Sequence, residues 1–297
     1  MSETPARPHH PHVVVAFDFD QTLSTRTTDH LVRHLGVDPD EFERNAVAPR
    51  VAAGWDTRLA EAAALLELSR TSEHGPVTRS TFDELGATLE LYPGVADLFE
   101  ILRDAVGEIS TDLSVEFHLI TAGFVEMPSA TPIASEFTSI RGGHWAFDDD
   151  GALNDGALND GALCFPASTL GHDAKVRHLE ALAKGLDTID DDASPDLRAP
   201  LPLAEWHAPW EQVIYVADGN SDLPAFEFVR RHGGTAIGVH QAPTDAEWDA
   251  ADAMRPGRRV DALHRSDYRD GRPLLDTMID AVTRAALHAR ITARSTH

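Results

Sequence analysis

Short apolar runs alternate with helical patterns over most of this chain. Four runs are too short for helices and are apolar on both faces, which is typical of central strands in a parallel sheet; they occupy residues 13–17, 115–120, 213–216 and 236–239. Amphipathic helical patterns lie between or after them, at residues 95–106, 174–183, 223–231 and 274–291. Strands that alternate with helices predict an α/β fold with a doubly wound, mainly parallel sheet.

The interval 25–91 has a different pattern. It contains no convincing strand, and its amphipathic stretches at 55–68 and 80–91 predict helices. We therefore expect a helical cap at 25–91, inserted after the first strand, with Tyr92-Pro93-Gly94 marking the return to the core. The core then comprises residues 13–24 and 92–297, and the polar residues 1–12, which lack the apolar stretch of a secretory signal, form a disordered leader.

Two further segments are predicted to be irregular. Residues 151–163 read GALNDGALNDGAL, a repeat that we interpret as a hairpin tip lengthened by duplication. A calcium loop is the alternative, but Ala152 stands where a ligand is needed. The Asp- and Pro-rich stretch 187–209 predicts a surface loop.

Composition and charge exclude several classes of partner. Lys and Arg number 25 against 49 Asp and Glu, so the formal net charge of −24 argues against binding to nucleic acid or to an anionic membrane. No apolar run is long enough for a transmembrane helix. The single cysteine, Cys164, excludes disulfides within the chain and cysteine-based zinc sites, and favours a cytoplasmic location.

Two carboxylates follow the first predicted strand directly. The chain reads Asp18-Phe19-Asp20-Gln21-Thr22, and because side chains alternate along an extended segment, Asp18 and Asp20 face the same way. The carboxyl end of a strand is where open α/β sheets bind their ligands. The spacing and the position together make this pair a candidate reaction site.

The other predicted strands also end in polar groups. The second runs into Thr121-Ala122-Gly123, where a hydroxyl and backbone amides can hold a phosphate oxygen. The third runs into Asp218-Gly219-Asn220-Ser221-Asp222, and Lys175 falls in the first turn of the helix predicted between them. Because the carboxyl ends of parallel strands meet at one edge of a sheet, we expect all of these groups to lie together.

The order of these motifs resembles that of the haloacid-dehalogenase (HAD) superfamily of hydrolases, and most of all its phosphoserine-phosphatase-like branch. DFDQT matches the first motif, LITAG the second, Lys175 the third and DGNSD the fourth. The resemblance covers about residues 13–24 and 92–240. It implies a HAD-like Rossmannoid core, with the helical cap between the first and second motifs.

The resemblance also implies a role for each residue. Asp18 is the expected nucleophile, which forms an aspartyl phosphate, and Asp20 is the expected general acid and then base. The Asp18 and Asp218 carboxylates and the Asp20 main-chain carbonyl are expected to hold Mg²⁺. Asp222 is a weaker ligand, or it orients Asp218 or pairs with Lys175. Thr121, Lys175 and the Gly123 amide are expected to bind the phosphoryl group.

The implied activity is a Mg²⁺-dependent phosphatase acting on a small phosphorylated metabolite. Asp20 favours phosphoryl chemistry over dehalogenation, because a halide leaves without a proton. Residues 24–29 contain no Glu to bind a substrate amine, so phosphoserine is not the expected substrate. A phosphotransferase or phosphomutase with the same intermediate, and a catalytically silent phosphate-binding regulatory protein, remain as alternatives. The sequence does not predict the oligomeric state.

Several charged residues have competing interpretations. Arg26, Arg50 and Arg58 in the predicted cap can recognise a substrate anion, although solvent-facing positions are the more common role for such residues. Asp222 can instead cap the helix that follows it. Lys184, just before Gly185, suits the carboxyl end of a helix. The histidines of the predicted leader, His9, His10 and His12, can bind metal adventitiously.

Overall fold

The computed structural model describes residues 10–148, 161–171, 173–186, 200–241 and 260–294. Within these residues a seven-stranded sheet has the order β4-β3-β2-β1-β5-β6-β7. Every neighbouring pair is parallel except β3 and β4, which are antiparallel. The strands are β1 (His12–Phe17), β2 (Ser114–Phe124), β3 (Ser139–Phe147), β4 (Leu163–Ser168), β5 (Val213–Ala217), β6 (Thr235–His240) and β7 (Ala262–Arg265).

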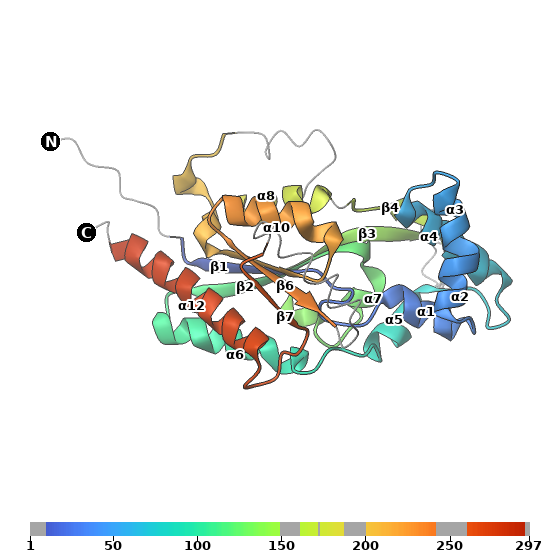
Figure 1. The fold of residues 1–297 in the computed structure, drawn as a ribbon, viewed down its shortest axis with the longest axis horizontal. Coiled ribbons are helices and arrows are strands. Elements are labelled where there is room, and N and C mark those ends of the chain that lie inside the picture. Colours follow the sequence, from blue (N-terminus) through green and yellow to red (C-terminus); the bar gives the residue numbers. More distant parts are fainter. Residues whose placement is uncertain (1–9, 149–160, 172, 187–199, 242–259, 295–297) are drawn as a thin grey trace, which may run out of the picture.

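Helices cover both faces of this sheet (Figure 1). One face carries α6 (Val95–Ile109) and α12 (Pro273–Arg294), and the other carries α8 (Ala174–Lys184) and α10 (Leu223–Arg231). The predicted α/β class with a doubly wound, mainly parallel sheet is therefore confirmed. Short elements complete the core: α7 (Glu126–Ser129) and the 3-10 turns η2 (Ala134–Glu136), η3 (Leu203–Glu205), η4 (Trp210–Gln212) and η5 (Asn220–Asp222).

The central strand β1 is buried from Val13 to Phe17 because both of its faces are covered there. Val13, Val15 and Phe17 pack into the cluster that includes α6 and α12. Val14 and Ala16 pack into the cluster that includes α8 and α10. An apolar residue at every position from Val13 to Phe17 is what a central parallel strand requires.

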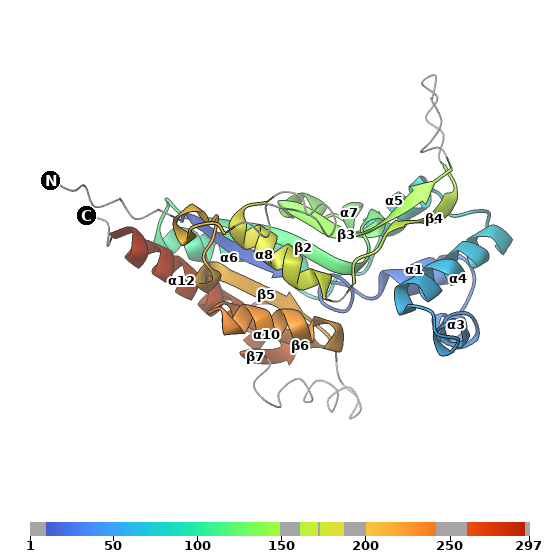
Figure 2. The same cartoon turned by 90° about the horizontal axis from the view of Figure 1, so that it is seen from above.

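Residues 25–91, all of which the structure describes, are helical. The elements are α1 (Thr27–His34), α2 (Pro39–Phe42), the π-helical turn η1 (Glu43–Val47), α3 (Ala48–Ala52), α4 (Thr57–Thr71) and α5 (Arg79–Ala87). We call this segment the helical insert. In both views α1, α3 and α4 lie beyond the carboxyl end of β1, the strand that α1 follows in the chain (Figures 1 and 2).

The amino-terminal boundary differs from the prediction. The expected leader reaches residue 12, whereas β1 already begins at His12 and His10 is only 8% exposed. His10 is fixed because its ring Nδ1 lies 2.6 Å from the carbonyl oxygen of Trp206, and its own carbonyl accepts a hydrogen bond from Gln212. Residues 1–9, most of the repeat at 151–163 and residues 187–199 of the predicted loop lie outside the described residues.

No helix among the described residues combines the length and the apolar character needed to cross a bilayer.

Gly94 begins α6 in a backbone conformation that favours glycine, with φ of +86°. A Cβ atom there would lie 2.4 Å from backbone atoms of Tyr268 and Arg269. We expect Gly94→Ala to lower the free energy of unfolding by about 3 kcal/mol, since a left-handed conformation and a steric overlap each destabilise. Urea unfolding measures the change.

Gly107→Ala in the same helix is the matched control. A Cβ atom at Gly107 would meet no atom within 4 Å, so this substitution should stabilise the helix by about 0.5–1 kcal/mol. Equal effects of the two substitutions would contradict the steric explanation for Gly94.

Candidate active site

The candidate site lies where the strand order reverses. β1 pairs with β2 on one side and with β5 on the other, so the carboxyl end of β1 is the switch point at which such sheets bind ligands. Asp18 follows β1 directly, is 6% exposed and donates its backbone N–H to Val216 of β5 at 2.9 Å. The pairing with β5 therefore extends to the candidate nucleophile itself.

A buried ammonium joins two of the predicted acids. Lys175 lies in the first turn of α8 and is 0% exposed. Its Nζ lies 3.0 Å from Asp18 Oδ2 and 2.6 Å from Asp222 Oδ1. Although burial alone would lower the pKa of Lys175, the two carboxylates raise it to about 12. Lys175 is therefore a permanent positive charge beside Asp18.

Asp222 holds Lys175 in place. Its Oδ1 also accepts a hydrogen bond from the Tyr215 hydroxyl at 2.6 Å, and its Oδ2 accepts one from Ser221 at 2.9 Å. Asp222 precedes α10 but makes no side-chain capping hydrogen bond, so the capping alternative does not describe this side chain. Of the alternatives for Asp222, pairing with Lys175 is the one seen in the structure.

Asp218 follows β5 and completes a group of three carboxylates. Asp18, Asp218 and Asp222 each offer an oxygen within 4.8 Å of the others. Burial, and next the Asp18 carboxylate, raise the pKa of Asp218 well above its usual range. Burial likewise raises the pKa of Asp18, against the opposing effect of Lys175. Three carboxylates thus face one ammonium, which leaves negative charge uncompensated.

This group fits a divalent hard cation. Asp18 Oδ1 is buried and has no hydrogen-bond partner among the described residues, so it presents an unused acceptor. The donors are carboxylate oxygens, which Mg²⁺ prefers. The oxygens of Asp222 are engaged by Lys175, Tyr215 and Ser221, so Asp18 and Asp218 are the better ligands.

Asp20 is oriented by the first turn of the helical insert. Its Oδ1 accepts a hydrogen bond from the backbone N–H of Thr27 at 2.7 Å, and its Oδ2 accepts one from the Thr27 hydroxyl at 3.3 Å. Burial raises the pKa of Asp20, although both bonds to Thr27 oppose the shift. A carboxyl group with a raised pKa and a fixed orientation is suited to donating a proton.

Thr121 and Gly123 lie beside Asp20. The expected end of β2 at residue 120 is too early, because the strand continues to Phe124 with a register shift between Ile120 and Phe124. The Gly123 N–H donates to Thr121 Oγ1 at 2.9 Å. A Cβ atom on Gly123 would lie 3.1 Å from Asp20 Oδ2, so the second motif lies against the first and leaves the backbone accessible there.

Arg58 lies near the candidate acids, although the sequence pattern favours a solvent-facing position for it. It lies in α4, its side chain is 27% exposed, and its Nη1 lies 3.0 Å from Glu61 Oε2. Although burial alone would lower the pKa of Arg58, Glu61, Asp20 and Asp18 raise it. The helical insert thus places a guanidinium within electrostatic range of both candidate catalytic acids. Arg26 pairs with the other oxygen of Glu61 at 3.2 Å.

No protein-family model matches the chain, and no curated protein matches its sequence. Solved structures do match. A HAD family hydrolase from Salmonella enterica serovar Typhi has a TM-score of 0.54 at 15% identity, over 93% of this chain and 72% of its own.

Two phosphoserine phosphatases also match in structure. A substrate-bound phosphoserine phosphatase has a TM-score of 0.50 at 14% identity, over 89% of this chain and 96% of its own. An unliganded protein described as a probable phosphoserine phosphatase, from Vibrio cholerae, has a TM-score of 0.53 at 13% identity, over 96% of this chain and 68% of its own. At such identities the likeness is one of fold. The chain has the fold of the haloacid-dehalogenase hydrolases, in the form found in phosphoserine phosphatases.

Proposed function

We propose that this chain is a Mg²⁺-dependent phosphomonoester hydrolase that acts on a small phosphorylated metabolite through an aspartyl phosphate on Asp18. The observation that carries the proposal is the buried contact of Asp18 with Lys175, beside Asp218, at the switch point of the sheet. A nucleophilic carboxylate, a fixed positive charge and an oxygen-rich cation site are the parts that phosphoryl transfer needs.

Asp18 would attack phosphorus, and the alcohol would leave as the phosphorus–oxygen bond breaks. Asp20, held by Thr27, would donate the proton that the departing oxygen requires. Water would then attack the phosphorus of the aspartyl phosphate and give a proton to Asp20. The bond between phosphorus and the Asp18 oxygen would break, which releases inorganic phosphate and restores the Asp18 carboxylate. Lys175 and the Thr121 hydroxyl would stabilise the phosphoryl oxygens, and the Gly123 amide would join them by exchanging its hydrogen bond to Thr121 for one to a phosphoryl oxygen. Asp18 and Asp218 would hold Mg²⁺, which when bound supplies positive charge against the phosphoryl group.

The helical insert would supply selectivity as a cap. Arg58 lies within electrostatic range of Asp18 and Asp20, so a second anionic group on the substrate would meet a guanidinium there. Arg50 is its natural comparison, because it also pairs with a glutamate, Glu67, and bonds to the carbonyl of Ala46, whereas the partner of Arg58, Glu61, lies within electrostatic range of Asp20. This placement favours small phosphate esters that carry a further carboxylate or phosphate.

Phosphate release from a panel of small phosphomonoesters tests the reaction class. The panel pairs esters that carry a second anionic group with neutral analogues of equal size. We expect release in the presence of Mg²⁺ and none with EDTA, and faster turnover of the anionic esters. Transfer of phosphate to an added alcohol in place of water would favour a phosphotransferase. No release from any ester by folded protein would favour a silent phosphate-binding protein.

Substitution of Asp20 should produce an effect that depends on the leaving group. Asp20→Asn keeps an oxygen that can accept the hydrogen bond from the Thr27 backbone N–H, places an NH2 group beside the Thr27 hydroxyl, and cannot donate a carboxylic proton. We expect kcat/KM for an alkyl phosphate to fall by about 100-fold or more. The value of kcat/KM for nitrophenyl phosphate should fall much less, because nitrophenolate leaves without a proton. Equal losses for both esters would contradict the general-acid role.

A further inference from the structure

A second cluster of potential ligands lies at the opposite end of β1 from Asp18. It consists of His12 at the start of β1, Glu116 in β2 and His207 in the segment between η3 and η4. Asp18 lies six positions after His12 along extended chain, which corresponds to about 20 Å. The cluster is therefore separate from the candidate active site, and none of its residues has a part in the proposed phosphatase mechanism.

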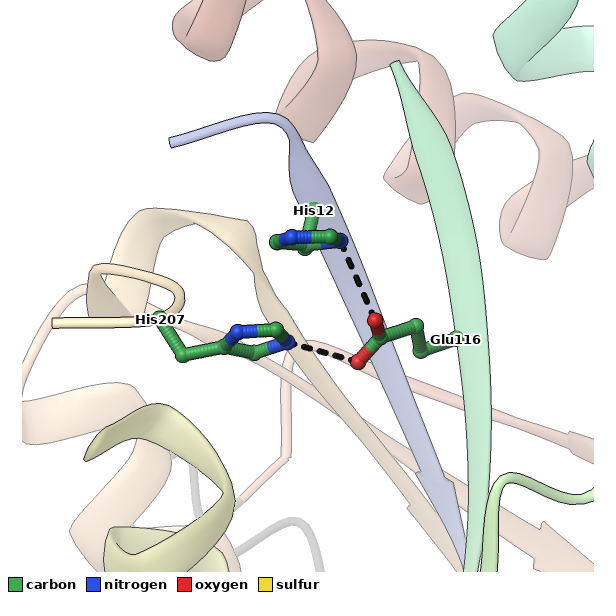
Figure 3. A group of neighbouring side chains, drawn as sticks. All are labelled: His12, Glu116 and His207. Carbon is green, nitrogen blue, oxygen red and sulfur yellow. Dashed lines mark hydrogen bonds and ion pairs between the residues drawn. The ribbon is translucent and has the colours of Figure 1, made fainter. Parts of the chain in front are cut away.

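The two histidines converge on one carboxylate (Figure 3). His12 Nδ1 lies 3.1 Å from Glu116 Oε1, and His207 Nε2 lies 2.7 Å from Glu116 Oε2. The rings of His12 and His207 are stacked, with centroids 4.0 Å apart and planes at 15°. The stacked rings bring one nitrogen of each histidine to the same carboxylate, so three potential ligand atoms lie within 4.8 Å of one another.

The register of the sheet brings these side chains to one face. His12 pairs with Ser114, and Val14 pairs with Glu116. Residues two apart on a strand share a face, so Glu116 lies on the same face as His12, beside the next residue of β1 on that face. By the same alternation His118 follows on this face, and its Nε2 lies 3.6 Å from Glu116 Oε2. A third nitrogen, and with it a fourth potential ligand, is therefore close to the group.

Buried hydrogen bonds hold the backbone around the cluster. Gln212, which is 0% exposed, donates to the carbonyls of His10 and His12 at 3.1 and 2.6 Å. The backbone N–H of Ala208 donates to the carbonyl of Ala183 at 3.0 Å, which fixes the segment that carries His207. Separate parts of the chain thus hold the three side chains close together before any ion binds.

Solvent reaches the cluster. The side chains of His12, Glu116 and His207 are 27%, 20% and 28% exposed. Glu116, His118 and His207 also line a cavity of about 430 Å³. An ion can therefore enter, and water can fill the coordination positions that the protein leaves open.

We propose that His12, Glu116 and His207 form a binding site for a divalent transition-metal ion of the Zn²⁺ class, with His118 as a candidate fourth ligand. Ligands at about 2.1 Å in a tetrahedral arrangement lie about 3.4 Å apart, so the nitrogen-to-oxygen separations of 3.1 and 2.7 Å need only a small adjustment. Imidazoles with one carboxylate suit Zn²⁺, Co²⁺ or Ni²⁺, whereas Mg²⁺ prefers oxygen ligands alone.

The bound ion would join the beginning of β1 to β2 and to the segment that carries His207. Binding should therefore raise the melting temperature of the protein, because the ion binds the folded chain in preference to the unfolded one. This effect is independent of phosphatase activity, so the site and the proposed function can fail separately.

Co²⁺ titration of the full chain, with excess Mg²⁺ to occupy the acidic site, tests the proposal. We expect one Co²⁺ per chain, the visible absorption bands of nitrogen-ligated cobalt in a low-coordination site, and a higher melting temperature. Glu116→Gln and His207→Gln should each weaken binding by more than about 100-fold, which exceeds the usual effect of losing an outer partner of a ligand.

Two variants serve as controls. His144→Gln removes a histidine that also faces a carboxylate, Glu126 at 3.7 Å, but is 57% exposed and has no part in the cluster. His9→Gln removes a candidate adventitious ligand of the amino-terminal segment. Both variants should bind Co²⁺ like the wild type. The far-ultraviolet circular dichroism of every variant in EDTA shows whether the fold is retained.

Three outcomes would overturn the proposal. The first is wild-type protein that binds no Co²⁺ in the presence of Mg²⁺, a result that needs no variant. The second is loss of binding in His9→Gln with retention in His207→Gln. The third is a spectrum of six-coordinate, all-oxygen cobalt, which would assign the ion to the carboxylates near Asp18.

Discussion

Asp18→Asn is expected to abolish turnover, with a loss in kcat of about 10⁴-fold or more. The amide has nearly the shape of the carboxylate but cannot form the aspartyl phosphate. The fold should survive, because Lys175 keeps its contact with Asp222 at 2.6 Å. The melting temperature at neutral pH should be equal or higher. Because folding raises the pKa of Asp18, its ionisation destabilises the folded protein as pH rises, and asparagine removes that effect.

Phosphate release and thermal unfolding, measured on the same preparation, check this prediction. Asp97→Asn is the matched control, since Asp97 lies exposed in the first turn of α6 and should leave turnover unchanged. Appreciable activity of folded Asp18→Asn would contradict the assignment of the nucleophile. Loss of activity together with loss of the fold would contradict the role proposed for the Lys175–Asp222 pair in retaining the structure.

Lys175→Met is expected to lower both the free energy of unfolding and kcat. The substitution keeps a chain of similar length but removes the positive charge between Asp18 and Asp222, both of which are buried. Removing one partner from a buried ionic group usually lowers the free energy of unfolding by about 3–5 kcal/mol. Loss of a charge aimed at the transferring phosphoryl group should lower kcat by about 100-fold or more.

Lys184→Met tests whether this effect is specific. Lys184, the other lysine of the chain, lies at the carboxyl end of the same helix and pairs with Glu180 at 2.7 Å, as expected for a structural residue. Its replacement should lower the free energy of unfolding by less than about 1 kcal/mol and leave kcat unchanged. Urea unfolding and steady-state kinetics measure both effects. Similar results for the two lysines would contradict the central position assigned to Lys175.

The central strands and the covering helices could be predicted because their sequences have only one plausible environment. An unbroken apolar run such as residues 13–17 must be covered on both faces. The predicted helix at 223–231 has the same bounds as α10. The two edge strands, β4 and β7, and β3 beside β4 were missed because they lack this signal. β3 contains Gly142 and Gly143, β4 contains Pro166, which an edge strand tolerates, and β7 has only four residues.

The placement of the motif residues could also be predicted, because the topology alone brings the carboxyl ends of parallel strands together. The contacts that connect the site to the helical insert could not. Thr27 holds Asp20, and Arg58 lies near both catalytic candidates, only because α1 and α4 fold back over the end of β1. Likewise His12 was assigned to the leader, since nothing local shows that its partners are Glu116 and His207.

The central position of β1 has a consequence for how the protein is made. Val14 pairs with Glu116 and with Val213, about one hundred and about two hundred residues later in the chain. During synthesis the most apolar strand therefore emerges first and waits for both neighbours, and closing such long loops slows folding. The Asp18 environment is completed only when β5 and Asp222 have left the ribosome. Chains that stop earlier should expose the edge of β1 that pairs with β5 and aggregate, so the stretch from β5 to Asp222 completes both this pairing and the surroundings of Asp18.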